Sequence, residues 1–247
     1  MKNREKWQPS KYIYKRGKLI ASGNRKEVGV GSRLMADLIA EFYGESLGKY
    51  AKGKLLDLGC GKVPLFIAYR QYITENICVD WENASYKNEY IDFEYDLTKV
   101  LPFIGEEFDT IILSDVLEHI PNPEQLWSEM VRILAVNGMI IMNVPFYYHL
   151  YEQPHDYYRY TEFALRRFVE NSGLNLVQLK PIGGTPEIVA DIFAKQFQFI
   201  PLIGNGLEIV IQYITKFFVK TALGRKLSEK TAQTFPFGYF LIAEKEK

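Results

Sequence analysis

Two glycines follow a short apolar run and form a turn on which a small cofactor could bind. Residues 55–61 read Leu-Leu-Asp-Leu-Gly-Cys-Gly, and a stretch compatible with a helix follows at 64–72. This order predicts a buried parallel strand that ends in a tight turn, because glycine accepts backbone conformations that other residues avoid. Gly59 and Gly61 would let a ligand lie against the backbone, and Asp57 would place a carboxylate beside it.

Other nucleotide-binding turns match this segment less well. A dinucleotide fingerprint needs a third glycine three residues after the second, so that the helix can approach the pyrophosphate. That position is Pro64, whose nitrogen has no hydrogen to donate to a phosphate. Lys62 is not part of a Gly-Lys-Ser/Thr sequence, so a P-loop is not indicated either. A nicotinamide-dependent or flavin-dependent oxidoreductase is therefore the weaker alternative.

A second carboxylate is expected at the end of the next strand. Residues 76–80 read as a strand that ends at Asp80, nineteen residues beyond Gly61. An acid in this position can accept both ribose hydroxyls of an adenosine group, whereas the plainer alternative is a residue of the turn after the strand. Trp81 either stacks beside the adenine or packs in the core.

These residues resemble the motifs of the class I S-adenosylmethionine (SAM) dependent methyltransferases. Asp-x-Gly-x-Gly at 57–61 resembles motif I, and residues 114–120 resemble the segment after the family's fourth strand. The resemblance covers residues 32–180, fits a type 11/23-like subgroup and implies SAM as the cofactor. It implies that Asp96 binds the adenine amino group with the next backbone amide near the ring, although a surface turn is the alternative for this residue. The cofactor-binding residues that it implies are Asp57, Gly59, Cys60, Gly61, Asp80, Trp81, Asp96, Leu97, Ser114 and Asp115.

Helices and strands alternate along the middle of the chain. A helix is expected from Ser32 to Gly48, and another from Asn122 that ends at Gly138. Five alternations of helix and strand indicate right-handed crossovers and a doubly wound parallel sheet. Ligands of such sheets bind outside the carboxyl ends of the strands, where the candidate cofactor residues are expected. Further strands are expected at 90–93, 108–113 and 139–144.

The end of the chain completes the sheet after an insertion. Thr161 is expected to begin a helix, 174–179 to form a sixth strand and 237–243 the last strand, which the resemblance implies is antiparallel. Residues 185–233 carry two amphipathic helices. We therefore predict an α/β, Rossmann-like, doubly wound seven-stranded sheet, mostly parallel, with a helical insertion before the last strand. The predicted domains are a basic N-terminal arm, 1–31, and a methyltransferase domain, 32–247.

The loop after the fifth strand has the composition of an acceptor pocket. Residues 146–160 contain six tyrosines, two histidines and an arginine, which suit a hydroxylated, saccharide-like substrate because aromatic faces pack on sugar rings. His155 is the candidate general base, since neutral imidazole titrates near physiological pH, and Asp156 would orient it or contact the substrate. The run from His155 to Thr161 resembles a segment of one methyltransferase subgroup, and a structural role for it stays open. The candidate substrate residues are Tyr147, Tyr148, Tyr157 and Arg159.

Composition narrows the choice of partners. The 247 residues include 30 basic and 30 acidic side chains, so net charge favours neither nucleic acid nor an anionic surface. Residues 1–30 hold nine Lys or Arg, and such an arm would grip an anionic partner, cover the cofactor or remain solvated. The sequence lacks the signature tetrapeptide of amino-group DNA methyltransferases and the Pro-Cys of cytosine enzymes, so a nucleic-acid substrate is disfavoured. Two cysteines are too few for a zinc cluster, so no metal is expected, and they fit a reducing cytoplasm.

Residues 186–223 carry many apolar side chains that must be buried against another surface. A membrane interface, a lipid-linked acceptor, a homodimer contact and a lid on the same domain are all open, whereas charged residues interrupt any run of the ~20 apolar residues that would span a bilayer. Residues 1–18 lack the apolar core of a signal peptide, so export is not expected. We predict a cytoplasmic enzyme, with peripheral membrane contact left open, that transfers a methyl group from SAM to a hydroxyl oxygen of a small-molecule, saccharide or lipid-linked acceptor. The alternative is a non-catalytic SAM-binding or membrane-docking module.

Overall fold

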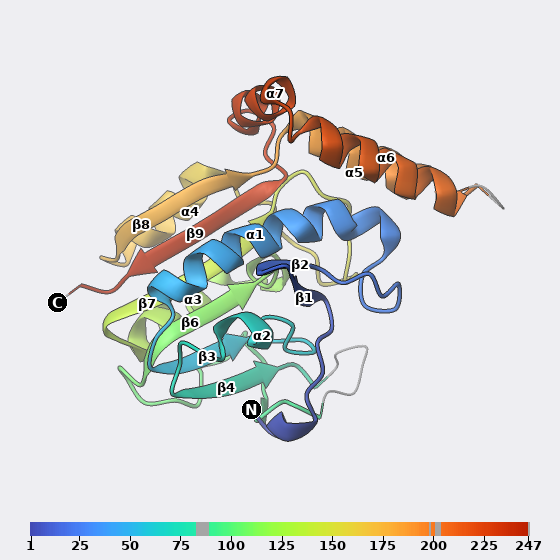
Figure 1. Ribbon diagram of the computed structural model, residues 1–247. Coiled ribbons are helices and arrows are strands. Elements are labelled where there is room, and N and C mark those ends of the chain that lie inside the picture. Colours follow the sequence, from blue (N-terminus) through green and yellow to red (C-terminus); the bar gives the residue numbers. More distant parts are fainter. Residues whose placement is uncertain (83–88, 198, 201–203, 247) are drawn as a thin grey trace.

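A mostly parallel sheet of seven strands forms the centre of the molecule (Figure 1). The computed structural model describes residues 1–82, 89–197, 199–200 and 204–246. The strand order is β5-β4-β3-β6-β7-β9-β8, and β9 runs antiparallel to both of its neighbours. This order confirms the predicted doubly wound sheet with an antiparallel last strand. The strands of the sheet are β3 (Lys54–Leu58), β4 (Glu75–Asp80), β5 (Phe93–Glu94), β6 (Phe108–Ser114), β7 (Leu134–Pro145), β8 (Asn175–Ile182) and β9 (Gly238–Glu244).

Strand β3 lies at the point where the strand order reverses. It pairs in parallel with β4 on one side and with β6 on the other. The loops that leave these three strands diverge to opposite faces of the sheet, and this opens a crevice outside their carboxyl ends. The fold therefore places the glycine turn after β3 at the ligand-binding edge.

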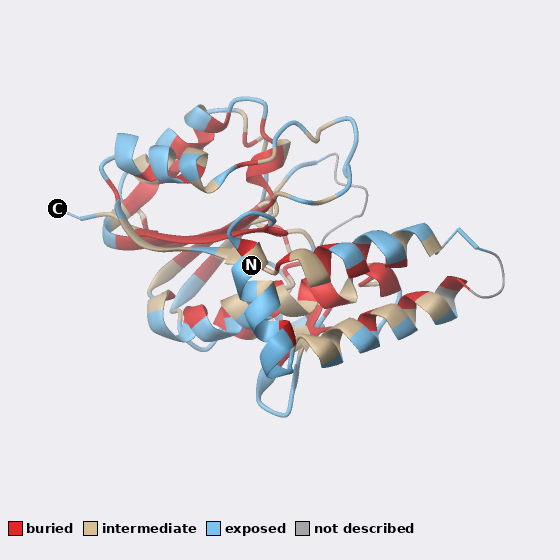
Figure 2. Cartoon of the chain, turned by 90° about the horizontal axis from the view of Figure 1, so that it is seen from above, coloured by how far each residue is buried: buried red, intermediate tan, exposed pale blue. Residues whose placement is uncertain are grey.

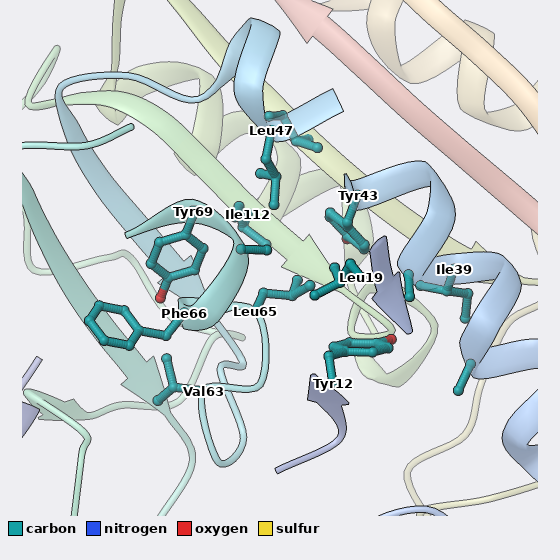
Figure 3. Close-up of a cluster of buried hydrophobic side chains, with 14 of the residues drawn as sticks. Tyr12, Leu19, Ile39, Tyr43, Leu47, Val63, Leu65, Phe66, Tyr69 and Ile112 are labelled. Carbon is teal, nitrogen blue, oxygen red and sulfur yellow. The ribbon is translucent and has the colours of Figure 1, made fainter. Parts of the chain in front are cut away.

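Helices cover both faces of the sheet and bury two apolar cores. Side chains of β3 alternate between them: Leu55 belongs to one core and Leu56 to the other. Figure 3 shows part of the first core, where Tyr43 and Leu47 from α1 meet Ile112 of β6. The helices are α1 (Arg33–Tyr50), α2 (Phe66–Tyr69), α3 (Pro123–Ile133), α4 (Glu162–Asn171), α5 (Thr185–Phe197), α6 (Gly204–Phe218) and α7 (Ala222–Ala232), with short 3₁₀ helices η1 (Arg4–Lys6), η2 (Val30–Ser32) and η3 (Leu117–His119).

Several expected element boundaries are wrong. The helix after the glycine turn spans only α2 instead of 64–72, and α1 continues past Gly48 to Tyr50. Helix α3 ends at Ile133, and Gly138 lies within β7 rather than at a helix end. Pairing of Leu134 with Phe108 of β6 recruits this stretch into the sheet, so tertiary pairing overrides the local helix-stop signal.

The first 31 residues pack against the domain. A hairpin of β1 (Tyr12–Lys15) and β2 (Lys18–Ala21) follows η1, and it lies beside α1. Trp7 and Tyr12 are buried, and the amino group of Met1 lies 2.7 Å from a carboxylate oxygen of Asp92. The solvated-tail alternative for this arm is therefore wrong, because Trp7 and Tyr12 belong to the first core. Figure 3 shows Tyr12 in that core.

The described residues of the insertion before β9 form three helices rather than the two expected. Helices α5 and α6 lie side by side and project from the body of the molecule, as Figure 2 shows. Helix α7 begins where the hydroxyl of Thr221 accepts a hydrogen bond from the amide of Gly224, a cap that the sequence analysis missed. No helix among the described residues combines the length and the apolar character needed to cross a membrane.

Candidate active site

One cavity of about 1060 Å³ opens at the carboxyl ends of β3, β4 and β6. All the cofactor-binding residues expected from the sequence line it, so the topology brings them together. They come from four separate strand ends and from the loops that follow. These residues are Asp57, Gly59, Cys60, Gly61, Asp80, Trp81, Asp96, Leu97, Ser114 and Asp115.

The turn after β3 requires glycine at its first position. Gly59 has φ +64°, and a Cβ there would lie 2.5 Å from Cγ2 of Val116. The amides of Gly59 and Cys60 donate to the carbonyl of Val79 at 2.8 and 3.1 Å, which ties the turn to β4. Gly61 also has a positive φ, +54°. The backbone therefore forms a bare cradle in the cavity wall, as a bound adenosine group needs.

Asp57 is a buried acid beside this cradle. Its carboxylate accepts a hydrogen bond from the hydroxyl of Tyr69 at 3.0 Å. Burial outweighs this bond and raises the pKa of Asp57 to about 7, with a smaller contribution from the charge of Asp80. A positively charged ligand would favour the ionised form, so the residue suits a cofactor that carries a sulfonium and an amino group.

The carboxylate of Asp80 is held in a defined direction at the end of β4. One oxygen accepts from the amide of Gly61 at 2.9 Å and the other from the amide of Trp81 at 2.8 Å. These contacts connect the second strand end to the glycine turn. Both contacts are the turn contacts that were the alternative for Asp80, and its role toward a ribose stays a prediction.

Asp96 combines a place in the cavity wall with a local turn. One of its oxygens accepts from both the amide and the hydroxyl of Thr98, at 2.9 and 2.7 Å. Burial alone would raise the pKa of Asp96, but the hydrogen bonds from Thr98 and the charge of Lys99 lower it. Asp96 is thus ionised at neutral pH and available as an acceptor for an amino group.

A polar network joins the end of β6 to β7 and α1. The hydroxyls of Ser114 and Tyr43 both donate to the side-chain oxygen of Asn143, each at 2.8 Å. The side-chain amide nitrogen of Asn143 donates to one carboxylate oxygen of Asp115 at 2.5 Å. The ammonium of Lys11 lies 3.3 Å from the other carboxylate oxygen. This network holds Asp115 at φ +55° in the cavity wall.

The N-terminal segment supplies cavity residues that the motif analysis missed. Ser10, Lys11 and residues 26–29 line the cavity, and the carboxylate of Glu27 lies 3.1 Å from the ammonium of Lys62 in the glycine turn. The charge of this segment was evident from the sequence. Its position at the cavity depends on the packing of its hairpin against α1, which the sequence did not show.

The aromatic loop after β7 forms the opposite wall. His155 lines the cavity, with Nδ1 3.0 Å from the hydroxyl of Tyr157 and its ring edge-to-face with Trp81 at 4.9 Å between centroids. Tyr148 and Tyr157 also line the cavity. Three residues expected to contact the acceptor therefore line the same cavity as the expected cofactor-binding residues.

Three other expected residues lie outside the cavity lining. Asp156 accepts two hydrogen bonds from Arg159, at 2.5 and 2.7 Å, and another from the amide of Tyr151. The carboxylate of Asp156 is thus paired with Arg159, three residues away, and its expected role, to orient His155 or to contact the substrate, stays a prediction. Tyr147 is 42% exposed and packs against Phe235. Arg159 ties the loop together by also donating to the carbonyl of His149 at 3.1 Å.

A buried polar group below the loop was not expected from the sequence. The hydroxyl of Tyr151 donates to Glu118, which is wholly buried, and burial raises the pKa of Glu118 to about 8. His119 lines the cavity and its Nδ1 lies 2.7 Å from the carbonyl of His155; since a carbonyl only accepts, Nδ1 carries the hydrogen. Residues 114–120 were assigned to the cofactor by resemblance, but burial of this carboxyl could not be read from them.

Metal binding is not indicated by this arrangement. Within the described ranges, no group of three or more His, Cys, Asp or Glu side chains is positioned to hold a metal ion. Cys60 and Cys78 are both free and buried.

Comparison with known proteins gives one family-model match and several solved structures of similar fold. Residues 56–142 match a family model described as a methyltransferase domain. No curated protein sequence matches the chain. Several solved structures share the fold, as follows. A SAM-dependent methyltransferase from Archaeoglobus fulgidus is 19% identical, with a TM-score of 0.56 over 90% of this chain and 95% of that one. A geranyl diphosphate methyltransferase in complex with SAM is 13% identical, with a TM-score of 0.53 over 90% and 93%. The 4+2 cyclase SpnF is 15% identical, with a TM-score of 0.55 over 96% and 87%.

The strand order is that of a Rossmann-like fold, and the glycine turn and the acids at the strand ends form its ligand site. Residues 56–142 match the methyltransferase-domain model, and the chain shares its fold with SAM-dependent methyltransferases of known structure, one of which was solved in complex with SAM. The residues present suit that cofactor, because a glycine cradle, a buried acid and two further acids all line the same cavity.

Proposed function

We propose that the protein transfers a methyl group from SAM to a hydroxyl oxygen of a small-molecule, saccharide-like or lipid-linked acceptor. The observation that carries this proposal is the continuity of the cavity, whose lining includes both the residues around the glycine turn and the aromatic loop after β7. An acceptor held by this loop would lie beside a cofactor held by the turn. Aromatic faces with hydroxyl groups between them are suited to bind a hydroxylated ring.

The proposed reaction is an in-line displacement at the methyl carbon. The acceptor oxygen forms a bond to the methyl group while the carbon–sulfur bond breaks, and S-adenosylhomocysteine is released. The acceptor proton passes to a general base, for which we propose His155. Its imidazole lines the cavity, and the hydroxyl of Tyr157 at 3.0 Å from Nδ1 would hold the ring in place.

The proposal is tested in two stages. Calorimetry should detect SAM binding by the wild-type protein, and Asp80→Ala should weaken it because the carboxylate that would contact the ribose is lost. Transfer of a radiolabelled methyl group into fractions of cell extract, followed by mass spectrometry of the labelled product, then identifies the acceptor. In a turnover assay with that acceptor, His155→Ala should bind SAM normally and turn over roughly 100-fold more slowly, the scale of general-base catalysis. Unchanged turnover would remove His155 from the mechanism.

The same assay tests the alternative function, a SAM-binding module without methyltransferase activity. One solved structure with the fold is that of a cyclase, so the fold by itself does not require methyl transfer. SAM binding without transfer to any fraction would favour a non-catalytic SAM-binding module. We place the protein in the cytoplasm, in keeping with its free cysteines.

A further inference from the structure

Helix α6 turns its polar side chains toward the domain. Glu208 and Gln212 are buried, and Gln212 accepts from the amide of Leu34 at 3.2 Å and donates to the carbonyl of Val30. Lys216, one turn further along, forms an ion pair with Asp37 of α1. These contacts use the polar face of α6 to bind η2 and the first turns of α1. Its apolar face is left with no place in the core.

Helix α5 also buries polar side chains, together with the apolar Ile188, Ala190 and Ala194. Glu187 is buried and accepts from the hydroxyl of Ser228 at 2.7 Å, while Asp191 is buried and pairs with Lys195 at 2.6 Å. Glu187 thus attaches α5 of the projecting hairpin in Figure 2 to α7, whereas the pair of Asp191 and Lys195 lies within α5. The orientation of α6 is the reverse of that of the usual helix on a soluble domain, where the apolar stripe faces the core.

The apolar face of α6 is exposed to solvent. It consists of four side chains at helical spacing i, i+3, i+4 and i+7, which therefore form one continuous stripe. Tyr213 is 76% exposed, Ile214 64% and Phe217 75%. The stripe is completed by Val210, and α5 exposes Val189, Ile192 and Phe193. A contiguous apolar stripe of this kind marks an interaction surface.

Basic residues continue from this stripe. Lys220 is exposed three residues after Phe217. On α7, Leu223, Lys226, Leu227 and Lys230 are all exposed and share one face by their spacing. Glu229 is the one exposed acid among the described residues of α5 to α7, since the other three acids are buried. Exposed apolar and cationic side chains without matching acids complement an apolar surface that carries negative charge.

We infer that the exposed faces of α6 and α7 bind the surface of a bilayer containing anionic phospholipids. Tyr213, Ile214 and Phe217 would enter the boundary between headgroups and acyl chains, while Lys220 and the lysines of α7 would pair with phosphates. A symmetric dimer through this surface is less compatible with its positive charge. In an isologous interface the same lysines of the two subunits would face one another, with few acidic side chains to balance them.

The hairpin that carries part of this surface also contacts the cavity wall, through α5. The ammonium of Lys195 on α5 lies 3.8 Å from the ring centre of Tyr148, which lines the cavity wall. Gly31 in η2 packs against Lys195, and the neighbouring Ser32 lines the cavity too. The hairpin is therefore attached to the same wall that we propose for the acceptor. Resting on the proposed function, this placement favours a lipid-linked acceptor presented at the membrane surface.

The test measures flotation of the full chain with vesicles. Vesicles of phosphatidylcholine with phosphatidylglycerol should carry the protein at low salt, those of phosphatidylcholine alone should carry much less, and added salt should release it. The double variant Tyr213→Ser/Phe217→Ser should reduce partitioning by at least about tenfold, because two aromatic anchors are lost. Lys226→Glu/Lys230→Glu should remove the preference for phosphatidylglycerol.

A matched control separates this surface from general hydrophobicity. Phe163 is 73% exposed and Phe217 is 75% exposed. Phe163 lies on α4, which packs on β8 and β9, so Phe163→Ser should float like the wild type. Circular dichroism and SAM binding confirm that each variant is folded.

Three results would overturn the inference. They are no flotation with any vesicle, equal loss in Phe163→Ser, and a wild-type dimer that Tyr213→Ser/Phe217→Ser converts to a monomer without vesicle binding. Flotation requires no methyl transfer, so its failure would leave the proposed enzyme activity standing, and absence of SAM binding would leave the membrane surface standing.

Discussion

At the scale of single residues, burial decides the protonation of two carboxyl groups around the cavity. Asp57 lines the cavity directly, whereas Glu118 lies below the aromatic loop, hydrogen-bonded to Tyr151. Burial raises the pKa of Asp57 to about 7 and that of Glu118 to about 8. Both groups therefore change charge near physiological pH, and each leads to a measurable pH dependence.

Asp57 should make SAM binding dependent on pH. The cationic cofactor prefers the ionised carboxylate, so the association constant should fall as pH drops below about 7. Calorimetric titrations from pH 8 to pH 5.5, roughly one unit or more on each side of that pKa, would measure the fall. Asp57→Asn should bind SAM weakly and without this dependence. A parallel fall in wild type and variant would assign the effect to another group, the amino group of SAM included.

Glu118 should make stability dependent on pH. Its folded pKa lies above the ordinary value of 4.5, so folding requires protonation and stability is lost as pH rises from about 4.5 to about 8. Glu118→Gln lacks this cost, and its melting temperature relative to wild type should rise across that range and level off above it. Thermal unfolding monitored by circular dichroism at several pH values gives the comparison. A constant difference at all pH values would show that Glu118 does not titrate there.

At the scale of elements, the turn after β3 depends on a contact from elsewhere in the fold. Val116, which follows β6, fills the space that a side chain at position 59 would need. The positive φ of Gly59 adds a backbone requirement to this steric one. The motif's first glycine is therefore required by its neighbour as well as by the ligand.

Gly59→Ala should lower the stability of the domain by more than the cost of backbone strain at that position. A left-handed alanine costs about 1–2 kcal/mol, and the clash with Val116 should add to that cost and displace the turn, so SAM affinity should fall as well. Gly173→Ala is the matched control, because Gly173 has φ +67° and no atom near its missing Cβ. Denaturant unfolding and calorimetry measure both effects. Equal destabilisation of the two variants with normal SAM binding would contradict this interpretation of the turn.

At the scale of the whole molecule, the cavity connects segments that are distant in the chain. Lys11 of the N-terminal segment, Asp80 at the end of β4 and His155 of the aromatic loop all line it. A ligand that contacts several of these segments binds only the folded chain. Ligand binding should therefore stabilise the domain as a unit.

SAM should raise the melting temperature of the wild-type protein. At 100 times its dissociation constant a ligand adds about 2.7 kcal/mol of stability, which corresponds to roughly 5–10 °C for a domain of this size. Scanning calorimetry with and without SAM measures the shift. Asp80→Ala should lose most of it at the same SAM concentration, whereas Phe163→Ser on α4 should keep it. No shift in the wild type would argue against SAM as a ligand of this cavity.

The sequence by itself determined the sheet and the position of its ligand site. Apolar runs that end in glycine or acid mark the carboxyl ends of parallel strands, and the topology of such a sheet brings those ends to one edge. This is why the motifs alone were enough to place Asp57, Asp80 and Asp96 around one cavity. Their exact roles toward the cofactor stay predictions.

The tertiary structure alone decided which partners the side chains take. Asp156 pairs with Arg159 instead of His155, Lys11 reaches Asp115 through a contact 104 residues apart, and Gln212 of α6 turns inward to bind η2 and α1. Local patterns specify periodicity and caps, but they do not specify which face of an amphipathic helix meets the domain. That choice depends on polar groups already unsatisfied elsewhere, such as the amide of Leu34 at the start of α1, and only the folded chain brings them within hydrogen-bonding distance.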